Sequence, residues 1–199
     1  MAAGITSALI GAITAVMGWF ITEYFVRRRS NESMRQEAAL QHLKYQIEEL
    51  YGPLIGLIQR SSTVYQVAMR LLPPASDGQR DVTSLRGDAK KIWYFFVEEY
   101  FLPSNSEIRN LVLSRMHLFE GGTIPASIQQ FFEHATQFEC LHRLWREKNV
   151  TIPGMHGAEW PPDLEADIDG TLRKLQLRYQ EYRQQAEGRL GRVNSPSAA

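Results

Sequence analysis

The sequence has almost no cysteine and no excess of either charge. Among its 199 residues is one cysteine, Cys140, which excludes an internal disulfide and a zinc site built from several cysteines. Lys and Arg number 22 together, as do Asp and Glu, so the formal net charge is zero. Proteins dedicated to nucleic acid need basic surface to neutralise phosphates. We therefore do not expect a nucleic acid as partner.

The chain also lacks the short motifs that identify common enzymes. It contains no G-x-S-x-G, no G-x-x-x-x-G-K-[ST] and no G-x-G-x-x-G, the signatures of many hydrolases, NTPases and dinucleotide-binding proteins. Glu139 and His142 have the E-x-x-H spacing of carboxylate-bridged metal sites, but those sites use the pair twice and this sequence contains it once. We expect no metal and no cofactor, and the missing motifs favour a non-enzymatic role.

A long apolar run occupies the N-terminal part of the chain. From Gly4 to Val26 the only charged residue is Glu23. As a helix this run spans roughly 34 Å, enough to cross a hydrocarbon core of about 30 Å. Trp19 lies toward one end, where an amphipathic ring favours the interface. A basic flank suited to membrane anchoring follows at once, formed by Arg27, Arg28 and Arg29.

The order of these features predicts the topology of the anchor. A cleaved signal peptide carries its basic residues before the apolar core, whereas here they follow it. The positive-inside rule places the basic flank in the cytoplasm and the N-terminus outside. We expect residues 1–29 to be a single-pass transmembrane anchor in a lipid bilayer.

Small residues recur along one side of this predicted span. They are spaced by four and three residues in alternation, which places them on one helix face: Gly4, Ala8, Gly11, Ala15 and Gly18. Membrane helices associate through faces of small residues because these let the backbones approach closely. The pattern predicts self-association into a homo-oligomer.

The rest of the chain has the periodicity of helices. After a polar joint over Ser30–Gln36, apolar residues recur at spacings of three and four, at Leu40, Leu43, Ile47, Leu50, Leu54 and Leu57, and the phase continues to Leu71. Gly52 and Pro53 interrupt the stripe, and because proline clashes with the carbonyl four residues earlier, we expect a helix kink there. Polar loops are predicted over 73–88 and 149–162.

Three more helical segments follow the first loop. Lys90–Leu102 is rich in aromatic residues: Trp93, Phe96 and Tyr100 share one face, which Phe95 and Phe101 widen. This face is either part of the core or a flank resting on the bilayer surface. A turn is predicted at 103–107, then helices over 108–119, 125–148 and about 163–187. The sequence thus predicts an all-α fold, in which the anchor leads into a cytoplasmic antiparallel bundle of four to six helices (residues 30–187). A disordered tail over 188–199 ends the chain.

A nuclease is one alternative to a non-enzymatic role. One superfamily of small helical bundles cleaves RNA with an arginine and a histidine separated by four to six residues. Arg35 and His42 have six residues between them, and Arg109 and His117 have seven. Such spacings also arise by chance, so these four residues are weak catalytic candidates. A second alternative is a sensor that binds a small ligand near Trp93 and Trp145.

One short run carries a resemblance. Residues 47–54 read IEELYGPL and follow an apolar span and a polar joint. In this run and layout the chain resembles small bacterial single-pass membrane proteins of unassigned function that carry a cytoplasmic helical domain. The resemblance implies a bacterial inner membrane and no particular chemistry.

These observations favour a membrane-anchored helical protein that acts by self-association or through a cytoplasmic protein partner. A bacterial stress or defence effector is one role that suits this architecture, though architecture alone does not specify an activity.

Overall fold

The computed structural model describes residues 2–73, 85–150 and 158–193; for residues 2–16, 21, 29 and 188–193 it describes the backbone alone. Within these ranges the regular structure is entirely helical, which confirms the all-α prediction. The first elements are α1 (Ala2–Tyr45), a π-helical turn η1 (Gln46–Tyr51) and α2 (Gly52–Leu71). Next come α3 (Gly87–Phe96), a second π turn η3 (Val97–Phe101) and α4 (Leu102–Ser114). Two 3-10 turns, η4 (Met116–Leu118) and η5 (Glu120–Gly122), precede α5 (Ala126–Lys148) and α6 (Leu164–Val193).

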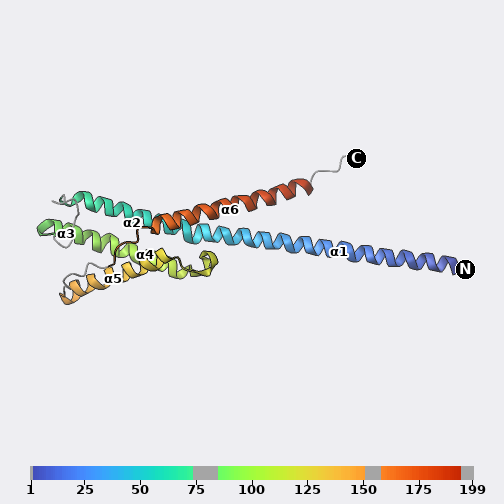
Figure 1. Ribbon diagram of the computed structural model, residues 1–199, viewed down its shortest axis with the longest axis horizontal. Coiled ribbons are helices and arrows are strands. Elements are labelled where there is room, and N and C mark those ends of the chain that lie inside the picture. The colour runs from blue at the N-terminus through green and yellow to red at the C-terminus, as the bar shows by residue number, and fades with distance from the viewer. Residues whose placement is uncertain (1, 74–84, 151–157, 194–199) are drawn as a thin grey trace. The chain divides into compact units, whose positions relative to one another are not determined.

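The chain divides into two units. One comprises Met1–Leu43 with Glu181–Ala199, and the other comprises Lys44–Gln180. In the second unit α2, α3 with α4, and α5 lie side by side (Figure 1), and α4 packs against both α2 and α5. This unit contains the core and the candidate functional site.

Several predicted boundaries were wrong. The predicted joint at Ser30–Gln36 is part of α1, since it contains no helix-breaking residue and Arg28 pairs with Glu32 one turn on, at 3.5 Å. The predicted turn at 103–107 is part of α4, because the π turn η3 before it lets the helix continue through Pro103. Residues 188–193 belong to α6, and the remainder of the predicted tail lies outside the described residues.

A search of the described residues finds no helix that is long and apolar enough to span a membrane. Residues 4–16 of the predicted span have no described side chains. The membrane anchor therefore stays a prediction.

Both π turns end two residues before a proline. In η1 the N–H of Gly52 donates to the carbonyl of Ile47, five residues earlier, and Pro53 follows. In η3 the N–H of Leu102 donates to the carbonyl of Val97, and Pro103 follows. In a regular α-helix the proline ring would clash with the carbonyl four residues earlier. The extra residue of a π turn widens the backbone at this point, and the helix continues through each proline.

The two π turns share a sequence pattern that the sequence analysis did not identify. Residues 47–53 read IEELYGP and residues 97–103 read VEEYFLP. Each segment has a β-branched residue, two glutamates, two apolar or aromatic residues, a variable position and proline. The chain therefore contains a short internal repeat whose two copies take the same local structure.

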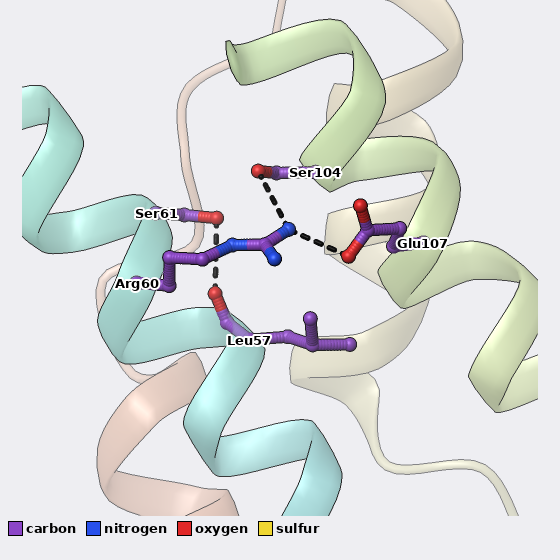
Figure 2. Close-up of polar contacts among 5 residues, drawn as sticks. All are labelled: Leu57, Arg60, Ser61, Ser104 and Glu107. Atoms are coloured by element: carbon purple, nitrogen blue, oxygen red, sulfur yellow. Dashed lines mark hydrogen bonds and ion pairs between the residues drawn. The ribbon is translucent and has the colours of Figure 1, made fainter.

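The two arms that carry these turns pack antiparallel. Glu49 pairs with Arg115 at 3.0 Å, whereas Arg60, further along the first arm, pairs with Glu107 at 2.6 Å. Figure 2 shows the Arg60 guanidinium donating to the Ser104 hydroxyl (3.3 Å) as well as to Glu107. Beside it, the Ser61 hydroxyl donates to the carbonyl of Leu57 at 3.1 Å. Polar contacts thus hold α2 against α4 at the edge of the core.

The helix that follows the first π turn buries the predicted stripe only in part. The unbroken stripe predicted Leu57 and Leu71 on the buried face, but Ile58 (0% exposed) and Leu72 (4%) are buried, and Leu71 is 58% exposed. Leu54 and Ala68, which belong to the same stripe, are buried as predicted, both at 0% exposed, so the predicted pattern holds in part. Residues of η1 itself are buried as well: the side chain of Gln46 donates to the carbonyl of Leu118 at 2.8 Å, and the ring of Tyr51 packs edge-on against Phe119.

Substitution of Gly52 tests the π turn. A Cβ at this position would lie 2.7 Å from the carbonyl oxygen of Ile47, the acceptor that closes the turn. We expect Gly52→Ala to lower the free energy of unfolding by about 1–3 kcal/mol, the usual cost of overpacking. Denaturant unfolding followed by circular dichroism measures this change.

Gly56→Ala is the matched control, one helical turn away. Nothing lies within 4 Å of a Cβ at Gly56, so alanine there should stabilise the helix by up to about 1 kcal/mol. If the two variants have the same stability, Gly52 is not held close to Ile47.

Candidate functional site: a groove between α3 and α5

The four catalytic candidates lie on α1, α4 and η4. Arg109 on α4 donates to Glu139 on α5 at 2.9 Å, and His117 lies exposed in η4 with no described contact to Arg109. Arg35 and His42 are both exposed on α1, which places them in the other unit.

The predicted anchoring residues lie on α1. Trp19 is 61% exposed, Arg27 donates to Glu23 at 2.7 Å, and of Arg29 only the backbone is described. The residues of the predicted self-association face also lie on α1, where Gly18 has open space around it. The side chains of Ala8 and Ala15 and the surroundings of Gly4 and Gly11 are outside the description.

The E-x-x-H pair is divided between two different partners. Glu139 accepts from Arg109, whereas His142 donates to Glu98 at 3.3 Å. No group of three or more metal-ligating side chains occurs among the described residues. Each member of the pair thus joins α5 to another helix.

The most concentrated set of aromatic and charged side chains lies where α3 and η3 face α5. Tyr94 and Trp145 stack with ring centroids 4.0 Å apart and planes 3° from parallel. One turn beyond, Glu98 accepts a hydrogen bond from His142 at 3.3 Å and forms an ion pair with Arg146 at 3.4 Å. Burial raises the pKa of Tyr94, and the charge of Glu98 adds to this shift. The stack and the shared carboxylate together hold α3 to α5.

This arrangement corrects one expectation about the aromatic residues. Trp93 and Trp145 do not share a site, because Trp93 packs against Phe101 (5.5 Å) and Tyr94 takes the place beside Trp145. The Lys90 ammonium lies 5.6 and 5.9 Å from the centroids of Tyr94 and Trp145. Because these two distances are nearly equal, the Lys90 ammonium lies beside the stack and not above either ring face. The faces within the stack are therefore not open to a ligand.

A groove runs along this contact and is open to solvent. Its volume is about 550 Å³, and it is lined by Gly87, Lys90, Lys91, Tyr94, Phe95, Glu98, Glu99, Trp145 and Arg146. Small-molecule sites are concave and bury most of the ligand. An open groove lined by charges and by already stacked rings suits a protein segment better than a small ligand.

Phe95, which lines the groove, and its neighbour Tyr100 are exposed, although the sequence pattern favoured placing them in the core. Phe95 is 52% exposed and Tyr100 41%, with their rings edge-to-face at 5.8 Å. Their neighbours Phe96 and Val97 take the buried positions, at 7% and 3% exposed. Contiguous exposed apolar surface marks interaction sites, whereas exposed hydrophobic residues scattered singly are normal. Phe95, Tyr100 and the groove residues on α3 and η3 are called the α3–η3 surface below.

A second histidine holds the segment before α6 against α5. The His134 ring N–H donates to the carbonyl of Ala158 at 2.7 Å, and the ring packs edge-on against Trp160. Burial is the main influence on the pKa of His134 and lowers it, despite the hydrogen bond to Ala158. The folded protein therefore favours the neutral ring.

This preference predicts a pH dependence of stability. As the pH falls below the ordinary pKa of histidine, the unfolded chain takes up a proton that folded His134 resists. Stability attributable to His134 should therefore decrease on acidification. Urea unfolding of the wild type and His134→Gln between pH 7.5 and 5 isolates this part. Equal pH dependence in the two proteins would show that His134 contributes nothing.

Comparisons of the chain with family models, with curated proteins and with solved structures found no match. The resemblance carried by residues 47–54 therefore stays an expectation.

Proposed function

We propose that this chain is a membrane-anchored interaction protein that acts through protein docking at the α3–η3 surface. The exposure of Phe95 and Tyr100 beside an open groove is the observation that carries the proposal. Protein interfaces combine central aromatic residues with a polar rim, and aromatic side chains supply much of their binding energy. Here the rim consists of Lys90, Lys91 and Glu99.

The proposed anchor is the apolar run of residues 4–26. It is single-pass, with the N-terminus outside and the helical unit in the cytoplasm, and a bacterial inner membrane is the proposed location. The basic flank after the run supports this orientation. The ion pair between Arg27 and Glu23, 2.7 Å, reduces the cost of placing the one carboxylate of the run near the interface.

The other function classes have less support. A nuclease would need an arginine and a histidine at one cleft, but the Arg109 guanidinium is paired with Glu139, and His117 makes no described contact with it. A small-ligand sensor would need an enclosed pocket, and the groove is open. The docking proposal accounts for the exposed Phe95 and Tyr100, which neither a nuclease nor a small-ligand sensor explains.

Photo-crosslinking from position 95 tests the docking surface. A benzophenone amino acid replaces Phe95 in the full chain, and the matched control replaces Thr136, which is exposed on α5 and is not among the groove residues. After irradiation of native cells we expect a discrete protein adduct from position 95 and none from position 136. Absence of an adduct at position 95 would contradict the proposed function.

The membrane helix is tested by the mass of the solubilised full chain. If the small residues form an association face, Gly11→Leu and Ala15→Leu should each lower the oligomer mass, because a bulky side chain separates the backbones. Ile10→Leu, which lies off this face, is the control. The masses are measured by light scattering in detergent. Unchanged oligomer masses in both variants would show that this face does not mediate association.

A further inference from the structure

We infer that the partner of the α3–η3 surface is a second copy of the chain. The two copies would pack with their α3–η3 segments antiparallel about a twofold axis at Phe95. This inference rests on the proposed function and names the occupant of the same surface.

The charges on this surface are arranged symmetrically about Phe95. Lys91 lies four residues before it and Glu99 four residues after it. All three side chains are exposed and line the same groove, so they share one side of the segment. In a twofold interface the contacts are reciprocal. If residue i of one copy contacts residue j of the other, residue j of the first copy contacts residue i of the second. Antiparallel packing centred on Phe95 therefore places each Lys91 opposite the other copy's Glu99.

The same charges disfavour the parallel arrangement. Parallel segments in register would place Lys91 against Lys91 and Glu99 against Glu99, and opposed like charges weaken association. The order of lysine, phenylalanine and glutamate thus selects the antiparallel orientation. Phe95 would lie at the centre, where aromatic side chains contribute most to binding, and Tyr100 would extend the apolar contact.

Formation of this contact disrupts only a weak ion pair of the monomer. Lys91 pairs with Asp88 at 2.9 Å, but the two side chains are 81% and 87% exposed, and pairs this exposed contribute little to stability. Among the described residues, no ion pair involves Glu99. The burial of Phe95, which is 52% exposed in one copy, supplies the apolar part of the interface.

Charge reversal tests the pairing directly. In the full chain, with the benzophenone at position 95, Lys91→Glu leaves an acidic surface and Glu99→Lys leaves a basic one. Each variant alone should reduce the adduct of twice the chain mass by about tenfold, as like charges then oppose across both pairs. Lys174→Glu, at an exposed position on α6, is the charge-matched control and should leave the adduct unchanged.

Two combinations should restore the adduct. A mixture of differently tagged Lys91→Glu and Glu99→Lys chains should give an adduct that carries both tags, since both pairs are then attractive. The double variant Lys91→Glu/Glu99→Lys should recover the wild-type yield by itself. These recoveries also show that the single variants are folded.

The outcomes separate this inference from the proposed function. An adduct containing a different protein would retain the docking surface but overturn the second copy as its occupant. A self-adduct that is insensitive to all the charge changes would overturn the antiparallel arrangement. Absence of any adduct at position 95 would overturn both proposals.

Discussion

The structure of the helical unit depends on how two long helical arms pass a proline. Pro53 and Pro103 cannot donate a backbone hydrogen bond, and each ring would collide with the carbonyl four residues before it. In both arms the chain forms a π turn just ahead of the proline, closed by the bonds from Gly52 to Ile47 and from Leu102 to Val97. Each arm thereby continues as a helix through its proline.

The residues buried at and beside the two turns differ between the arms. In the first, η1 turns Leu50 and Tyr51 into the core, where Tyr51 lies against Phe119 and Ile58 continues the buried face. In the second, Phe96 and Val97 enter the core while Phe95 and Tyr100 face outward. The same seven-residue pattern therefore builds a core in one place and borders an exposed surface in the other. The outward aromatics are the basis of the proposed docking.

The all-helical fold was predictable because the apolar residues recur with a helical period and no second strand-like segment exists. The buried positions were predictable only in part. Leu54 and Ala68 of the predicted stripe are buried, but Ile58 and Leu72 are buried in place of Leu57 and Leu71. Comparison of the residues that precede Pro53 and Pro103 would have revealed the repeat. The groove could not be predicted from the sequence. Aromatic residues surround α3, and the position of Trp145 beside Tyr94 decides which of them remain exposed.

Distances between spin labels on two copies test the central claim that α3–η3 segments dock antiparallel at Phe95. Labels are introduced at Asp88 or Leu102 in a Cys140→Ser background, since Cys140 is exposed. In this arrangement the two copies of residue 88 lie about 21 Å apart along the helix axis, at 1.5 Å per residue. Residue 88 of one copy lies opposite residue 102 of the other. The account predicts that the 88-to-102 distance between copies is the shorter one. A shorter 88-to-88 distance, or no distance between copies, would contradict it.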